Sequence, residues 1–225
     1  MSSDRHRPSP PLLGAGVALT VLVGLLILAA VQSPHDAQSA RAAECTGEYR
    51  WNIKTLSDPD AGKVRLTPVK AGVADLYDLA KPAGFKSKVR NPPFETTTYK
   101  IRAKLVKARW VNEAPTASKK GGDLDIHLVI AALTNPDKTM IVEFPFADCV
   151  DAVPALKQKM VDARAAFVAR CKNGQPRRQF HNLSGIATVT GVGFYDRPHA
   201  IGSALHGVEL HPVIKFSSSS CHWLD

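Results

Sequence analysis

The sequence predicts a mainly β fold, an OB-fold-like five-stranded Greek-key barrel with a helix between its third and fourth strands and an N-terminal extension. The first observation is the order of the segments: three runs of alternating apolar and polar residues precede a helical pattern, and two such runs follow it. The second is Gly191 and Gly193 inside the fourth run, which indicate the strong bend of a barrel corner. An open α+β sheet with the helix on one face is the alternative architecture.

The first three strands form a predicted meander over residues 97–111, 123–133 and 139–146. In the first strand, basic side chains alternate with the residues that we expect in the core, which are Tyr99, Ile101, Ala103 and Leu105. In the second strand, Asp125 and His127 point outward if the alternation holds. The residues expected inside are then Leu124, Ile126, Leu128 and Ile130.

A helix is predicted next, between start signals at Asp151 and Pro154 and a stop at Asn173-Gly174. Its apolar stripe consists of Leu156, Met160, Ala163, Phe167 and Cys171. The last two strands cover residues 185–196 and 207–216. In the final strand the alternation directs Val208, Leu210, Ile214 and Phe216 to the core and predicts a solvated face formed by Glu209, His211 and Lys215.

Composition divides the chain into three predicted parts. Residues 97–225 form the barrel domain. Residues 43–96 are rich in turn formers, with one short helix predicted over 73–80, and are expected to form an extension packed on that domain. Residues 1–42 are expected to be a signal peptide or an N-terminal transmembrane anchor.

The N-terminal part contains an uncharged apolar run over residues 12–31, preceded by Arg5 and Arg7. The run is long enough to cross a bilayer as a helix, which favours an uncleaved membrane anchor. The tripeptide Ala40-Arg41-Ala42 also fits a signal peptidase site, and cleavage there would leave a chain that begins at Ala43. In both cases the arginines hold the N-terminus in the cytoplasm, so we expect a secreted or anchored domain outside it.

The cysteines agree with an oxidising compartment. All four, Cys45, Cys149, Cys171 and Cys221, follow the targeting segment, and none forms a C-x-x-C pair. Two disulfides therefore explain them better than thiolate metal binding does. Of the three possible connectivities we expect Cys45–Cys221 and Cys149–Cys171, because a link between the ends of the folded part restricts the unfolded chain most.

The chain is basic, with a formal charge of +9, and without residues 1–42 it keeps 26 basic and 18 acidic residues. A basic exported domain attracts anionic partners such as nucleic acid, teichoic acids, lipid headgroups or another component of the cell envelope. The first strand supplies the candidate ligand-binding surface, formed by Lys100, Arg102, Lys104, Lys107, Arg109 and Trp110. The competing interpretation is a solvated strand whose charges discourage aggregation.

Acids and histidines in or just after the predicted strands form a second candidate site. OB-fold pairing would place the first strand between the second and fourth, and the third beside the fifth, which would gather candidate metal ligands His127, Glu143, Glu209 and His211 near Asp125. Asp196 and His199 are the catalytic candidates. Such residues suit Zn²⁺ or Mn²⁺, which could activate water for hydrolysis. The competing interpretation is that all of them are solvated or pair across strands with basic neighbours.

Several segments together resemble a set of exported bacterial proteins of unknown function. These are RWNIKTLSDPDAGKV at 50–64, DIHLVI at 125–130, TMIVEFP at 139–145, and GVGFYDRPHA with GVELHPV within 191–213. The resemblance implies a secreted or anchored domain with an OB-like barrel and implies no activity. Two departures affect its loops: the family's His-Gly-Gln-Thr-Gly is replaced by His199-Ala200-Ile201-Gly202, and its Pro-Asp-Pro by Phe146-Ala147-Asp148.

Two functions follow from the sequence. The first is a non-enzymatic, extracytoplasmic binding module that uses its basic surface for an anionic polymer and needs no cofactor. The alternative is a metal-dependent hydrolase, for example of phosphodiesters, that uses the His, Glu and Asp cluster with a divalent metal. The sequence contains no H-E-x-x-H helix, no G-x-S-x-G elbow and no Gly-rich phosphate loop.

Overall fold

A computed structural model describes residues 49–110, 124–171 and 179–224. These residues belong to one compact unit, Ser33–Asp225. The predicted targeting segment, residues 1–42, and Cys45 lie outside the described residues. Within those three ranges no helix is long and apolar enough to cross a membrane.

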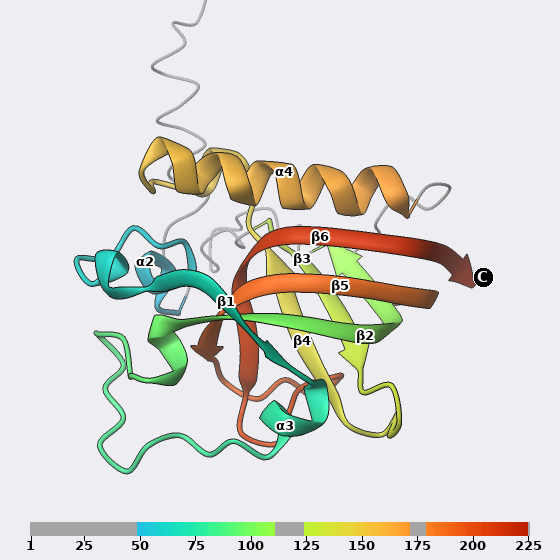
Figure 1. The fold of residues 1–225 in the computed structure, drawn as a ribbon, viewed down its shortest axis with the longest axis horizontal. Helices are drawn as coiled ribbons and strands as arrows, with labels where there is room; N and C mark the ends of the chain where they lie inside the picture. The colour runs from blue at the N-terminus through green and yellow to red at the C-terminus, as the bar shows by residue number, and fades with distance from the viewer. Residues whose placement is uncertain (1–48, 111–123, 172–178, 225) are drawn as a thin grey trace, which may run out of the picture. The chain divides into compact units, whose positions relative to one another are not determined.

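The fold is mainly β, with a six-stranded mixed sheet (Figure 1). The strands are β1 (Arg65–Ala71), β2 (Thr97–Trp110), β3 (Ile126–Ala131), β4 (Thr139–Phe144), β5 (His181–Tyr195) and β6 (Val208–Leu224). They follow the order β1-β2-β3-β4-β6-β5, and β2 also pairs with β5, so the pairings of the last five strands form a closed cycle. The pairs β1–β2 and β4–β6 are parallel, and the others are antiparallel. The predicted neighbours of the long strands are therefore confirmed.

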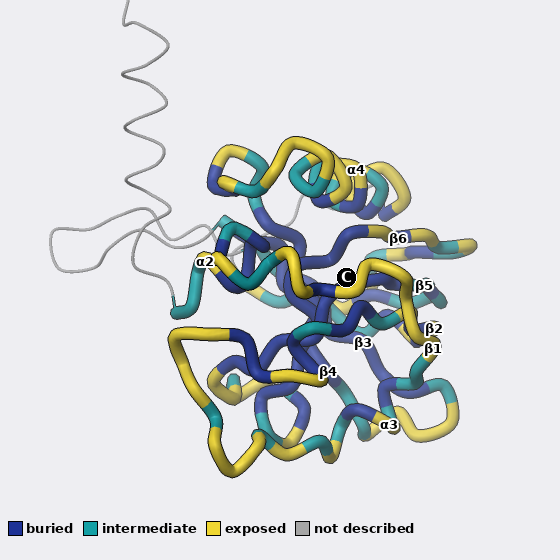
Figure 2. Tube along the Cα trace, turned by 60° about the vertical axis from the view of Figure 1, so that its left-hand side comes forward, coloured by how far each residue is buried: buried dark blue, intermediate teal, exposed yellow. Residues whose placement is uncertain are grey.

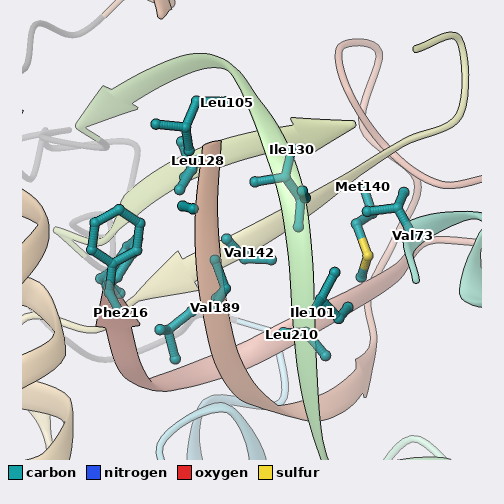
Figure 3. Packing of buried hydrophobic residues seen from close by; sticks show 14 of the residues in the cluster. Val73, Ile101, Leu105, Leu128, Ile130, Met140, Val142, Val189, Leu210 and Phe216 are labelled. Atoms are coloured by element: carbon teal, nitrogen blue, oxygen red, sulfur yellow. The ribbon is translucent and has the colours of Figure 1, made fainter. Parts of the chain in front are cut away.

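The core lies on the face of the strands that the alternation predicted. Figure 3 shows side chains from β2 to β6 and from the helix α3 (Val73–Tyr77) pointing toward one another, among them Ile101, Leu128, Val142 and Leu210. Leu124 is an exception, because it precedes β3, adopts a φ of 56° and is only half-buried. Burial of such aliphatic side chains stabilises the fold by about 1.5–3 kcal/mol each.

The predicted helix is α4 (Pro154–Arg170), which begins with its proline in the first turn. It packs along β6 (Figure 1) and buries Met160, Ala163 and Phe167. Directly after α4, Cys171 forms a disulfide with Cys221 of β6. Both predicted cysteine pairs are therefore wrong, since each used one of these residues. The reason is that β6 extends through the serine-rich tail and runs back along α4, which the predicted end at residue 216 did not include.

The segment before β2 contains more structure than the single predicted helix. Its elements are α2 (Trp51–Lys54), the 3-10 helix η1 (Ala61–Lys63), β1, α3 (Val73–Tyr77) and the 3-10 helix η2 (Phe94–Thr96); a further 3-10 helix, η3 (Ala147–Cys149), follows β4. The strand β1 is an edge strand that is exposed almost throughout and contains Pro68. Because β1 has no buried face, its sequence shows no alternation of apolar and polar residues, and the strand was not predicted.

The bend predicted in β5 is confirmed. The β5–β6 pairing shifts register between Thr190 and Gly191 and again between Gly191 and Gly193. A Cβ atom at Gly193 would lie 2.4 Å from the carbonyl oxygen of Phe94, so only glycine allows η2 to approach the strand this closely.

The second face of β3, β4 and β6 is also buried, and this contradicts the predicted solvated face. Figure 2 shows buried chain through most of these strands. Asp125, Glu143, Glu209 and His211 are each 0% exposed. The cover comes partly from the N-terminal segment, since Lys54 of α2 contacts Glu143 and the main-chain oxygen of Lys54 contacts His211. A second small apolar cluster is formed by Leu56, Val64, Val150, Met160, Val192 and Ile214. The prediction that Ile214 joins Leu210 and Phe216 in the main core is therefore wrong, because the β5–β6 register shifts next to Ile214 and places Val213 there instead.

Candidate functional site

A buried polar cluster occupies this second face of the sheet. His127 of β3 lies opposite Glu143 of β4 in their antiparallel pairing, and its Nε2 is 3.0 Å from Glu143 Oε1. Glu209 of β6 is the register partner of Ile141, two residues before Glu143. Because side chains two residues apart share a face, the three strands present their polar groups to the same space.

The segment after β5 brings Asp196 and His199 to the same cluster. His199 Nε2 lies 3.6 Å from Glu209 Oε1 and 3.9 Å from Asp196 Oδ2. The backbone N–H of His199 donates to Ser203 Oγ, and Gly202 approaches β3 so closely that a Cβ there would lie 2.4 Å from Val129 Cγ2. Packing of this loop against β3 therefore fixes the imidazole of His199 at the cluster.

Lys54 is a member of the cluster that the sequence did not single out. Its Nζ lies 3.0 Å from Asp196 Oδ2 and 3.3 Å from Glu143 Oε2, and its side chain is buried. Two buried ion pairs hold the segment that carries it: Arg50 binds Glu95, and Arg90 binds Asp58. A four-residue helix without an apolar stripe gives no periodic signal in the sequence, so α2 was not predicted. The segment RWNIK at 50–54, which contains Lys54, was noted only as part of the resemblance to exported bacterial proteins.

His211 is a doubly protonated imidazolium in this arrangement. Its Nδ1 is 2.9 Å from the main-chain oxygen of Lys54, so this nitrogen donates. Its Nε2 lies 2.9 Å from Asp125 Oδ2 and 2.8 Å from Glu143 Oε2, which also requires a proton there. Burial alone would lower the pKa of His211, but the charge of Glu143 and the hydrogen bonds with both carboxylates raise it to about 9. An imidazole with both nitrogens protonated has no lone pair for a metal, so His211 orients Glu143 instead.

Two carboxylates of the cluster, Glu143 and Asp196, are held ionised. Burial would raise the pKa of Glu143, but the charges of His127, Lys54 and His211 lower it well below its usual range. Burial acts on Asp196 in the same direction, but its interaction with His199 and the charge of Lys54 lower the pKa of this group to about 2. Both side chains are therefore anionic acceptors at neutral pH, the state that metal ligation requires.

Among the described residues, two groups of side chains converge closely enough to hold a metal ion. In the first, Glu143, Asp196, His199 and Glu209 each offer one ligand atom, and these atoms all lie within 4.8 Å of one another. The second consists of Asp125, Glu143 and His211, in which the imidazolium is itself the cation. The first group is therefore the better candidate, and we call it the four-ligand cluster.

The composition of the four-ligand cluster favours a hard or intermediate divalent cation. Carboxylate oxygens suit Mg²⁺, Ca²⁺ and Mn²⁺, and imidazole nitrogen suits Zn²⁺ and related metals. Three carboxylates with one imidazole match Mn²⁺ best, and Zn²⁺ next. His127 is a further buried polar group beside the four-ligand cluster, with its ring centroid 5.8 Å from that of His199. It is 4% exposed, and its Nδ1 makes no hydrogen bond within the described residues.

The predicted basic surface lies elsewhere. Lys100, Arg102 and Lys104 of β2 are exposed, as the alternation predicted. Their register partners on β5 are Thr190, Thr188 and Ile186, and not members of the polar cluster. A register shift between Leu105 and Lys107 changes the alternation, so the last three residues of the predicted surface, Lys107, Arg109 and Trp110, are half-buried. Arg109 lies apart from the exposed lysines and lines a hollow beside His199.

Comparisons with known proteins add little. No protein-family model matches the chain, and no curated protein does. A solved structure described as an aspartyl-tRNA synthetase from Leishmania major Friedlin is 13% identical, with a TM-score of 0.37. The match covers 70% of this chain and 22% of that one, so this chain spans about a fifth of its length. The resemblance to exported bacterial proteins stays a prediction.

Proposed function

We propose that the protein is a metal-dependent hydrolase and that the four-ligand cluster holds its divalent cation. One observation carries the proposal: two strands, β4 and β6, and the loop after β5 bring four ligand atoms within 4.8 Å of one another in a largely buried site. Buried carboxylates are costly unless they are paired with cations. Lys54 pairs with Glu143 and Asp196, and His211 pairs with Asp125 and Glu143, so cations already act on these carboxylates, and a divalent cation in the four-ligand cluster would act in the same way.

The chemistry follows from the ligand set. A bound divalent cation lowers the pKa of a coordinated water and so supplies a hydroxide nucleophile near neutral pH. His211 and Lys54 would hold Glu143 in place, and Ser203 would orient His199 through its backbone N–H. The side chain of His199 is 34% exposed while its Nε2 is buried, so the cluster lies close beneath the surface at this residue.

Hydrolysis of bis(p-nitrophenyl) phosphate by the purified protein tests the activity. We expect turnover that chelation abolishes and added Mn²⁺ restores, and a loss of at least about 100-fold in kcat/KM for Glu143→Gln and for His199→Ala. His222→Ala is the matched control, because His222 is an exposed histidine on β6 outside the cluster. Turnover that is equal with and without metal, or equal in His199→Ala and the control, would overturn the proposal.

For the fold, we propose an OB-fold-like barrel. The closed cycle of pairings from β2 through β3, β4, β6 and β5 supports it, as does the position of α4 between the third and fourth of these strands in chain order. An experimental structure tests it, and an open edge between β2 and β5 would refute it.

A second candidate function is binding of an anionic polymer by the exposed part of β2. It is supported by the exposure of Lys100, Arg102 and Lys104 on one face, with Lys215 of β6 exposed next to their β5 partner Thr190. Retention on heparin should fall with salt, and Lys100→Glu with Arg102→Glu should abolish it at physiological salt. Equal retention of the double variant would exclude this surface.

We also propose an extracytoplasmic location, with residues 1–42 as a signal peptide or anchor. The disulfide Cys171–Cys221 is compatible with it, because disulfides persist in oxidising compartments. Fractionation of expressing cells with N-terminal sequencing tests the proposal. A mature N-terminus at Ala43, or an intact chain in the membrane fraction, would support it, and an intact soluble chain in the cytoplasm would refute it.

A further inference from the structure

We propose that the hollow beside His199 binds a phosphate group of the substrate through the guanidinium of Arg109, which makes the substrate a phosphate ester. This inference rests on the proposed function, since it places the substrate next to the four-ligand cluster. The hollow has a volume of about 130 Å³ and is lined by Arg109, Ile141, Phe180, His199, Ala200 and Ile201. A water molecule occupies about 30 Å³ of liquid volume, so the hollow has room for a small anion.

Arg109 has the properties of an anion-binding group. Its Nε is buried without a hydrogen bond in the described part of the chain, and its guanidinium carbon lies 4.8 Å from the ring centroid of Phe180. Stacking on an aromatic ring fixes the plane of a guanidinium and leaves its edge for a ligand. A guanidinium binds phosphate oxygens in a bidentate manner, which a lysine cannot do.

The hollow adjoins the four-ligand cluster at His199. The imidazole of His199 lines the hollow, and its Nε2 lies 3.6 Å from Glu209 Oε1. Arg109 is also the register partner of His127 in the β2–β3 pairing, and His127 contacts Glu143. A group held by Arg109 is therefore adjacent to the ion that the cluster would bind.

The rest of the wall is apolar, so Arg109 is the cationic group that an anion in the hollow would meet. Ile141 is buried on one side of the hollow, and partial exclusion of water there strengthens the attraction between a guanidinium and an anion, whereas Ala200 and Ile201 are exposed. In the reaction, the oxygen of a water molecule would bond to phosphorus, the bond between phosphorus and the leaving oxygen would break, and the proton lost by the water would pass to the leaving oxygen, with the divalent cation making the water more acidic. Arg109 and the metal would together neutralise the charge on the phosphoryl oxygens.

Relaxation of ³¹P in inorganic phosphate by protein-bound Mn²⁺ tests the inference in the full-length protein. We expect Mn²⁺ on the wild type to enhance the relaxation strongly. Arg109→Ala should weaken phosphate binding about ten- to a hundredfold while the affinity for Mn²⁺ changes less than about twofold. Arg109→Lys should recover part of the affinity, and Lys100→Ala, the control on the exposed part of the same strand, should change neither value.

The outcomes separate the two proposals. If Mn²⁺ binds and phosphate binds equally well to Arg109→Ala, the phosphate site is refuted and the metal site stands. If Mn²⁺ does not bind the wild type at all, the metal site fails and the phosphate site falls with it.

Discussion

His211 Nε2 lies 2.8 Å from Glu143 Oε2, in a part of the protein where neither side chain reaches solvent. The imidazolium neutralises one of the carboxylates that the proposed metal site requires, and it does so without competing for the ion as a ligand. Removal of one partner of a buried ion pair leaves the other charge unpaired, at a cost of about 3–5 kcal/mol. The stability of the metal-free protein is therefore coupled to the proton on His211.

The free energy of unfolding of the metal-free protein should fall as the pH rises from about 6.5 to about 9. The pKa of His211 is raised to about 9 in the folded state, above its ordinary value of 6.5, so the folded state binds more protons in this range. The contribution is fully present below 6.5, is lost through the folded pKa and is on the order of 3 kcal/mol. Urea unfolding in a chelator at pH 6, 8 and 9.5 measures it. His211→Gln should be less stable and lack this slope, and a wild-type profile that is flat over this range contradicts the assignment.

Lys54→Met should lower the stability of the metal-free protein by about 3–5 kcal/mol, because Glu143 and Asp196 lose a buried cation. The same change should enlarge the stabilisation by Mn²⁺, since the ion then replaces the missing charge. Thermal unfolding with and without Mn²⁺ gives both values. Lys63→Met is the control, because the side chain of Lys63 is exposed, and similar shifts in the two variants would count against a role for Lys54.

Gly202→Ala should weaken Mn²⁺ binding about tenfold or more while the sheet stays folded. Gly202 has a φ of +80°, and an added Cβ would lie 2.4 Å from Val129 Cγ2, so the loop must move and carry His199 away. Gly62→Ala is the matched control, because a Cβ there meets nothing within 4 Å. Isothermal titration of both variants with Mn²⁺ decides the point, and equal affinities would mean that the loop does not position His199.

Loss of the Cys171–Cys221 disulfide should destabilise the protein by about 4 kcal/mol. The bridge closes a loop with a sequence separation of 50, and the chain-entropy relation gives this magnitude. Denaturation of the Cys171→Ser, Cys221→Ser double variant measures it. Peptide mapping without reduction is the independent check, and a peptide that joins Cys149 to Cys171 would contradict the pairing.

The alternation in the strands predicted most of the core, because Ile101, Leu128 and Leu210 recur with the period of a pleated strand. The same alternation placed Asp125, His127 and His211 on the opposite face correctly but could not show that this face is covered. The cover is irregular chain, α2 and the loop that carries His199, and contacts of this kind have no period in the sequence. Ion pairs between distant residues, such as Arg50 with Glu95, hold this cover in place and leave no local signal either.

Titration of the chelator-treated wild-type protein with Mn²⁺, followed by the electron paramagnetic resonance signal of the free ion, tests the central claim most directly. We expect one ion per chain to disappear from the free signal, and Glu209→Gln and His199→Ala to weaken this binding at least about tenfold. His222→Ala should bind like the wild type. A free-ion signal that rises from the first addition, as it does without protein, would contradict a metal site in this cluster.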